Sequence, residues 1–243
     1  MFRLVNFRTF QKSIAVAFGV AALTALGLAP GTAAFAQKAP VEGTDYRVVT
    51  PAQPIDTPNK IEVIEFFMYS CPHCNLIEPG FNDWAKRQGA DVVVRRVPVA
   101  FSNAWMPHQR LYYTLEALGK EGELRPKVFH AIHVDKNLLN TVDLMADWAA
   151  KNGIDRTKFI ETYNSFSVQT KVQRAAQVAH GFGVDSVPTI GIDGKYALNI
   201  TPESINKLDY LVSKERALQP AANTAAPSAN AAPPAVRKPE KKT

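Results

Sequence analysis

The sequence predicts an α/β fold in which a sheet is interrupted by a helical insertion. An apolar, β-branched run at residues 61–67 is followed by a helical pattern and by a second apolar run at residues 92–99, an order that favours two parallel strands. Helical patterns then fill the middle of the chain. After them, Asp193-Gly194 joins two short apolar runs, which is a strong hairpin signal. Strands on both sides of a helical block indicate one sheet with an insertion.

The chain opens with the layout of a secretory signal peptide. Three basic residues precede an apolar stretch from Ile14 to Leu28, and Ala34-Phe35-Ala36 matches a small-residue cleavage site. We therefore expect residues 1–36 to be removed near Ala36 and the mature protein to be exported to a setting where disulfides persist. An uncleaved membrane anchor is the alternative, which the shortness of the apolar stretch disfavours.

Charge and composition divide the rest of the chain. Three of the six net positive charges lie in residues 1–36 and three more in residues 217–243, so residues 37–216 are neutral and no nucleic-acid partner is expected. Residues 217–243 are rich in alanine and proline, end in basic residues and lack bulky apolar side chains. We expect a disordered tail there.

The first elements surround the only two cysteines. Residues 61–67 read IEVIEFF and predict a strand buried on both faces. Ser70 is then expected to cap a helix with Pro72 in its first turn. This helix is expected to continue to about Gln88, and Leu76 is one of the residues on its apolar face. The strand at residues 92–99 follows.

Five helices and a hairpin are expected next. The signals for the helices are an apolar face over residues 104–122, Pro126 at a helix start, a Thr141 cap with a Gly153 stop, an Asp155 cap, and a pattern from about Val168 to His180. The Asp193-Gly194 hairpin follows these helices. Thr201 is expected to cap a last helix, with Pro202 and Glu203 in its first turn.

The cysteine pair Cys71 and Cys74 is best explained as redox-active. A disulfide between them closes so short a loop that it stabilises by only about 2 kcal/mol, against about 5 kcal/mol for a hundred-residue loop. A stabilising staple is therefore the weaker alternative. Half of a zinc site is weaker still, because the chain has no second C-x-x-C, so no metal is expected.

The position of the pair predicts an asymmetry between the two sulfurs. Cys71 falls where a helix begins, so first-turn N–H groups and the helix dipole favour its thiolate, and His73 adds a donor and a charge. Cys74 lies one turn further in and is expected to be shielded. Cys71 is thus expected to bond to the substrate and Cys74 to resolve that bond. Each pKa unit of thiolate stabilisation favours the reduced form by about 1.4 kcal/mol, or about 30 mV, which predicts an oxidant.

Glu65 is a further candidate. It lies six residues before Cys71 inside the apolar strand, where burial makes a charge costly. A buried carboxylate beside a thiol is suited to exchanging the proton of Cys74. The alternative is a strand-end position with the carboxylate in water, and Glu62 is expected to be an ordinary surface residue.

The segments FFMYSCPHC and GVDSVPTIGIDGKY, with the helical block between them, resemble the DsbA family of thioredoxin-fold thiol–disulfide oxidoreductases over residues 45–216. The resemblance implies a thioredoxin-like domain at residues 37–100 and 176–216 and an all-helical insertion at residues 101–175. The implied site residues are the nucleophile Cys71, its disulfide partner Cys74, the tuning dipeptide Pro72-His73, the buried acid Glu65, and Pro188, a cis-proline that turns the Val187 backbone toward an extended peptide. Arg95 and Arg96 lie near where relatives place a basic partner for the acid.

The resemblance also implies a reaction cycle. A reduced, unfolded exported protein forms a mixed disulfide with Cys71, and a DsbB-like inner-membrane partner linked to quinone restores the Cys71–Cys74 disulfide. The expected protein is a periplasmic monomer without a cofactor. A disulfide isomerase or reductase of the same fold and a non-catalytic peptide-binding module are the alternatives.

Overall fold

The computed structural model describes residues 39–219 of the 243-residue chain. The expected signal peptide, its cleavage site and nearly all of the expected tail lie outside these residues. Within residues 39–219, every helix is too short or too polar to cross a membrane.

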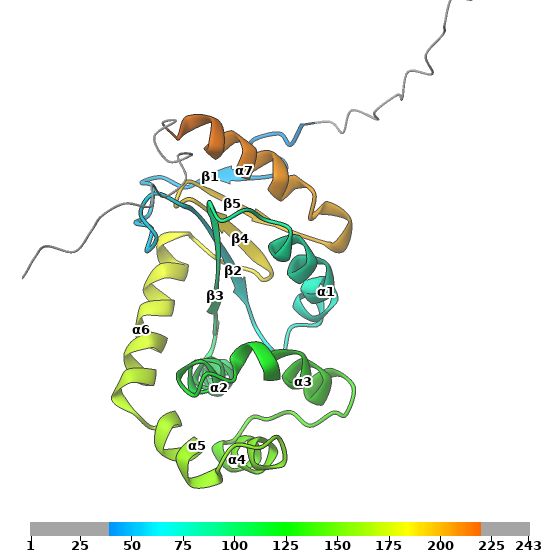
Figure 1. The fold of residues 1–243 in the computed structure, drawn as a ribbon, viewed down its shortest axis with the longest axis vertical. Helices are drawn as coiled ribbons and strands as arrows, with labels where there is room; N and C mark the ends of the chain where they lie inside the picture. Colours follow the sequence, from blue (N-terminus) through cyan, green and yellow to red (C-terminus); the bar gives the residue numbers. More distant parts are fainter. Residues whose placement is uncertain (1–38, 220–243) are drawn as a thin grey trace, which may run out of the picture. The chain divides into compact units, whose positions relative to one another are not determined.

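A five-stranded mixed sheet forms the centre of the described part (Figure 1). In spatial order its strands are β1 (Arg47–Val48), β5 (Tyr196–Asn199), β4 (Thr189–Ile192), β2 (Ile61–Phe67) and β3 (Val92–Pro98). The β2 strand runs parallel to β3 and antiparallel to β4, and β4 and β5 form the hairpin, as the sequence predicts. The two-residue strand β1 has no recognisable sequence pattern, and it is a strand because it pairs with β5.

Helices cover both faces of this sheet. The helices of the described residues are α1 (Pro72–Lys86), α2 (Met106–Ala117), α3 (Glu121–His133), α4 (Val142–Lys151), α5 (Arg156–Tyr163), α6 (Phe166–Gly181) and α7 (Lys207–Leu218), with short 3₁₀ turns η1 (Asn103–Trp105) and η2 (Pro202–Ser204). On one face α1 and α7 pack against Ile61 and Val63, and on the other α6 packs in the core that contains Ile64 and Phe66 (Figure 1). Because successive side chains of a strand point to opposite faces, β2 is buried along its whole length.

Local signals account for the starts of α4 and α5. The side chains of Thr141 and Asp155 accept hydrogen bonds from the N–H groups of the first turns of α4 and α5, as predicted. The expected helix start at Pro126 is wrong, because α3 begins at Glu121 and contains this proline. An internal proline costs about 3 kcal/mol. Burial of Leu124, Val128 and Phe129 on both sides of it offsets that cost.

The last helix also begins differently from the prediction. Thr201 caps the 3₁₀ turn η2, which contains Pro202, and α7 starts only at Lys207.

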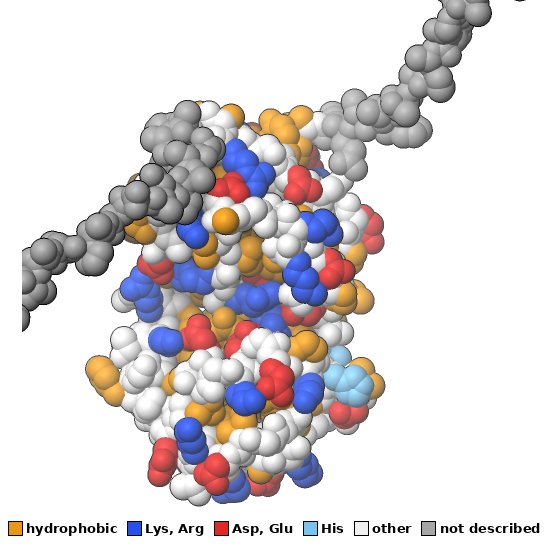
Figure 2. Space-filling view, in the orientation of Figure 1, with side chains coloured by type: hydrophobic (Ala, Val, Ile, Leu, Met, Phe, Trp, Pro, Cys, Tyr) orange, Lys and Arg blue, Asp and Glu red, His pale blue; other side chains and the backbone are white. Residues whose placement is uncertain are grey.

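Acidic and basic side chains both occur over the face drawn in Figure 2, in keeping with the neutral composition of residues 37–216.

Candidate active site

Cys71 lies between β2 and α1 and is itself the N-cap of the helix. Its sulfur accepts a hydrogen bond from the backbone N–H of Cys74 at 3.3 Å, and α1 starts at Pro72. The prediction that Ser70 caps this helix is wrong, since the Ser70 hydroxyl is buried and has no partner among the described residues. The chain enters the first turn one residue later than predicted, so a sulfur and not a hydroxyl faces the free N–H groups.

The two sulfurs differ in access. Both cysteines are free thiols, and Cys71 is 8% exposed whereas Cys74 is 0% exposed. In its protonated form the Cys71 thiol can donate to the carbonyl oxygen of Val187, 3.6 Å from its sulfur. The peptide bond from Val187 to Pro188 is cis, as the resemblance implies. The structure thus brings the cis-proline segment next to the sulfur of Cys71, although the two lie more than a hundred positions apart in the sequence.

The sulfurs also differ in acidity. The pKa of Cys71 is lowered to about 6, and the largest cause is the hydrogen bond from the Cys74 thiol. The backbone N–H groups of Cys74 and His73 and the charge of His73 lower this pKa further, whereas burial raises it. The same hydrogen bond, together with burial, raises the pKa of Cys74 far above its usual range. At neutral pH the pair therefore carries one thiolate, on Cys71.

A cavity of about 230 Å³ opens beside the pair, between the start of α1, the cis-proline loop and the segment after β5. Its lining includes His73, Leu76, Val187, Pro188 and Ile200. Leu76 was expected on the buried face of α1 but is 61% exposed, so it offers apolar surface to this cavity. Pro72 and His73 are also exposed.

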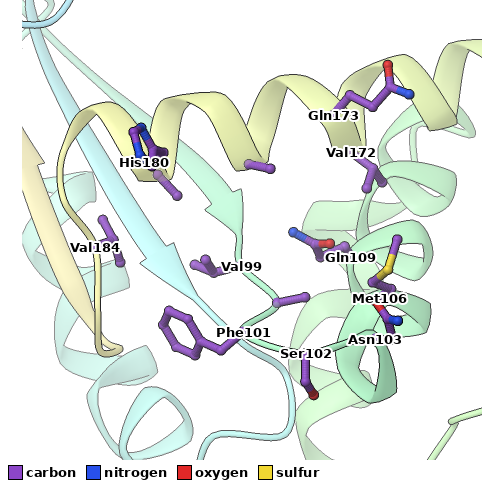
Figure 3. Close-up of a pocket in the computed structure, with 13 residues that line it drawn as sticks. Val99, Phe101, Ser102, Asn103, Met106, Gln109, Val172, Gln173, His180 and Val184 are labelled. Carbon is purple, nitrogen blue, oxygen red and sulfur yellow. The ribbon is translucent and has the colours of Figure 1, made fainter.

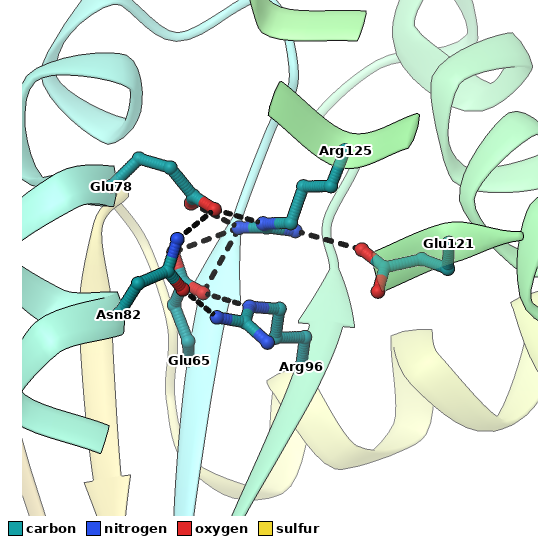
Figure 4. A network of polar contacts seen from close by, with 6 residues as sticks. All are labelled: Glu65, Glu78, Asn82, Arg96, Glu121 and Arg125. Atoms are coloured by element: carbon teal, nitrogen blue, oxygen red, sulfur yellow. Dashed lines mark hydrogen bonds and ion pairs between the residues drawn. The ribbon is translucent and has the colours of Figure 1, made fainter. Parts of the chain in front are cut away.

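Glu65 is completely buried and is held by two arginines (Figure 4). Arg96 donates to it at 3.0 Å, and Arg125 donates to both of its carboxylate oxygens at 3.0 and 3.2 Å. Burial raises the pKa of Glu65, and the charges of Arg125 and Arg96 oppose that rise. The carboxylate lies close enough to Cys74 for its charge to contribute to the raised pKa of that thiol.

Sequence reasoning missed Glu78 and Arg125, which belong to this cluster together with Asn82 and Glu121. Arg125 donates to the two oxygens of Glu78 at 2.7 and 2.8 Å. Their helical spacing was the available signal: Glu78 lies four residues after Cys74, and Arg125 lies four before Phe129, so both fall on buried helix faces.

Arg95, the other basic candidate, pairs instead with Glu62 at 3.1 Å. The expectation that Glu62 is a surface residue is wrong, because it is 1% exposed. The β2 strand lies inside the sheet with helices on both faces, which leaves its side chains no route to solvent.

A second cavity, of about 460 Å³, lies between α6 and the segment from Val99 through η1 to α2 (Figure 3). Phe101, Met106, His180 and Val184 are among its lining residues. None of the site residues predicted from the sequence lines it.

Residues 62–210 match the family model of the DSBA-like thioredoxin domain. The chain belongs to this DsbA family. It is 42% identical over 198 residues to the thiol:disulfide interchange protein DsbA of Burkholderia cepacia, covering 79% of this chain and 93% of that protein. With the protein of the same name from Bordetella pertussis it shares 47% identity over 189 residues, 77% of this chain and 85% of the relative.

Solved DsbA structures agree. The crystal structure of Pseudomonas aeruginosa DsbA matches with a TM-score of 0.71 at 39% identity, covering 73% of this chain and 95% of that one. The DsbA from Xylella fastidiosa matches with a TM-score of 0.70 at 33% identity, over 73% and 98% of the two chains. The predicted thioredoxin-like fold with a helical insertion is confirmed, as is the enzyme class, a protein thiol–disulfide oxidoreductase.

Proposed function

We propose that the chain is a dithiol oxidase that donates its Cys71–Cys74 disulfide to folding exported proteins. The proposed direction of the reaction rests on one observation: the site lowers the pKa of Cys71 and raises the pKa of Cys74. The pKa of Cys71 is lowered to about 6, so a thiolate stabilises the dithiol form. A protein whose dithiol is stabilised gives up its disulfide readily.

In the proposed reaction a substrate thiolate attacks Cys71 of the disulfide. A substrate–Cys71 bond forms, the Cys71–Cys74 bond breaks, and Cys74 leaves as a thiolate that takes up a proton. A second substrate thiolate then attacks the substrate sulfur and Cys71 leaves as the stable thiolate, so two electrons pass from substrate to enzyme. We propose that Glu65 exchanges the Cys74 proton, because it is buried near a thiol that is completely shielded from solvent.

Substrate contacts are proposed at Val187 and Pro188. The carbonyl of Val187 lies beside the Cys71 sulfur, where an extended peptide could add to the backbone as a further strand. The adjoining 230 Å³ cavity, with exposed Leu76 on its wall, would take an apolar side chain of that peptide. Pro72 and His73, exposed between the sulfurs, would tune the potential.

The remaining parts of the proposal concern context. We propose a periplasmic monomer, released by cleavage near Ala36 and reoxidised by a DsbB-like inner-membrane protein that passes electrons to quinone. We also propose that residues 37–100 and 176–216 form the thioredoxin-like domain and residues 101–175 the insertion. The helix α6 runs through the boundary at residue 175, so the two parts would share it.

Equilibration with glutathione tests the direction of the reaction. The expected potential is more oxidising than about −200 mV, the upper end of the glutaredoxin range. A value near about −270 mV, as in thioredoxin, would assign the chain to the reductases instead. A Cys71→Ala variant is expected to lose all oxidation of a reduced unfolded protein. If it kept the ability to replace an oxidase in cells, the site would be a peptide-binding module.

A further inference from the structure

Arg125 is the only lysine or arginine among residues 39–219 that is buried. It belongs to α3, inside the block of helices between β3 and β4, yet it pairs with carboxylates of two other elements, Glu65 on β2 and Glu78 on α1 (Figure 4). Through this one side chain the helical block reaches the buried acid of the site.

The position of the Arg125 guanidinium is determined from several directions. It holds the two oxygens of Glu78 in a fork, an arrangement that carboxylates and guanidinium groups form with high geometric specificity. Its central carbon lies 4.0 Å from the ring centroid of Phe67, at the end of β2. Glu121, one turn earlier on α3, pairs with it at 3.5 Å. Neither rotation nor withdrawal is available without breaking these contacts.

The charges in this cluster are unequal in number. Three carboxylates, Glu65, Glu78 and Glu121, face two guanidinium groups, those of Arg96 and Arg125. The Arg96 side chain keeps 20% of its surface in solvent, whereas that of Arg125 keeps 3%. Arg125 is thus the least screened countercharge, and without it Glu65 and Glu78 would share one partly solvated cation. Like charges in such a site force one group to hold a proton.

We propose that Arg125 is a positioning residue that sets the protonation and orientation of Glu65, and through Glu65 the proton exchange of Cys74. The helical insertion then contributes directly to the redox step. This inference rests on the proposed role of Glu65. The ionisable groups facing Glu65 are Glu78 and Cys74 on α1, Arg96 on β3 and Arg125 on α3. Tyr69, whose ring lies near Arg125, also faces this cluster.

The test follows the step in which Cys74 attacks a mixed disulfide between Cys71 and a model peptide, with release of the peptide thiol recorded against pH. In Arg125→Met the acidic limb of this profile is expected to move up by about one pH unit or more, a tenfold loss of rate on that limb. Methionine keeps an apolar stem over Phe67. Infrared spectra at neutral pH are expected to gain a band of a protonated carboxyl group.

Two further variants keep the inference testable if Arg125→Met does not fold. Arg125→Lys restores the charge without the fork, and its acidic limb is expected between those of the native protein and Arg125→Met. Glu78→Gln removes the competing carboxylate, so its limb is expected to move in the opposite direction, to lower pH. The matched control is Arg156→Met, which removes an arginine that is also paired with two carboxylates, Asp143 and Asp147, but at the surface. Its profile is expected to stay unchanged.

Glu65→Gln separates the two possible failures. If it leaves the acidic limb in place, the proposed role of Glu65 is wrong. If it removes the limb while Arg125→Met and Glu78→Gln leave it where it was, the role of Glu65 stands and the inference about Arg125 is overturned. A shift of the same size in Arg156→Met would also overturn it.

Discussion

The reactivity of the candidate site depends on which groups reach the sulfur of Cys71. The sequence predicted the helix N-terminus and His73 as the causes of a low pKa. In the structure the largest contribution is the hydrogen bond from the Cys74 thiol, followed among the lowering influences by the backbone N–H groups, with the charge of His73 last. The backbone N–H of residue 73 is kept in a His73→Ala variant.

His73→Ala is therefore expected to raise the pKa of Cys71 by less than about one unit. Such a change would move the equilibrium with glutathione by less than about tenfold, equivalent to about 30 mV. Titration of the thiolate by its ultraviolet absorbance measures the pKa directly. A rise of two units or more would show that His73, and not Cys74 with the helix N-terminus, is the main source of stabilisation.

Short-range hydrogen bonds explain where several helices begin. The caps at Thr141 and Asp155 could be read from the sequence, because threonine and aspartate are residue types that often precede a helix. The side-chain oxygen of each accepts a hydrogen bond from the backbone N–H three residues later. Cys71 could not be recognised as a cap in this way, since sulfur is a weak acceptor and Ser70 beside it is the stronger candidate.

Asp155→Ala is expected to lower the free energy of unfolding by about 1 kcal/mol. The Asp155 carboxylate accepts a hydrogen bond from the N–H of Lys158 at 2.8 Å, and alanine would leave that donor without a side-chain acceptor at the start of α5. Denaturant unfolding measures the change, with the exposed Glu161→Ala on the same helix as control. Equal stability of the two variants would contradict the capping role.

The redox state of the cysteines is expected to change the stability of the protein as a whole. A thiol whose pKa is about 6 when folded and about 8.5 when unfolded stabilises the reduced protein fully above pH 8.5, and this contribution disappears as the pH falls through 6. The disulfide form has no such thiolate. Above pH 8.5 the pKa difference of about 2.5 between the folded and unfolded states amounts to about 3.4 kcal/mol, which exceeds the about 2 kcal/mol that the short disulfide loop contributes to the oxidised form. There the reduced form should therefore melt at the higher temperature, since each kcal/mol corresponds to about 2–4 °C for a domain of this size.

Melting both forms between pH 5 and pH 9, a range of about four units around the two pKa values, tests this expectation. The melting temperature of the reduced form relative to that of the oxidised form should rise from about pH 6 to about pH 8.5 and then level off. A higher midpoint for the oxidised form above about pH 8.5, or an advantage of the reduced form that grows toward acid, would contradict the proposed oxidant.

Burial explains which of the sequence-based expectations were reliable. The central strand, the parallel pair and the hairpin each have a strong local pattern, and the structure contains them. Pro126 and Glu62 were misjudged because a neighbour distant in sequence outweighs the local preference: packing around α3 tolerates an internal proline, and Arg95 accompanies a buried glutamate.

The amino-acid sequence alone was enough to locate the cysteine pair, the strand and helix that hold it, and the acid at Glu65, because these features are encoded within a few residues of one another. The residues that contact Cys71 and Glu65 from other segments come from elsewhere in the chain. Val187 meets the Cys71 sulfur, and Arg125 meets Glu65, only after the sheet and the helical block have packed together. Contacts between distant segments depend on the folded arrangement, and no local pattern records them.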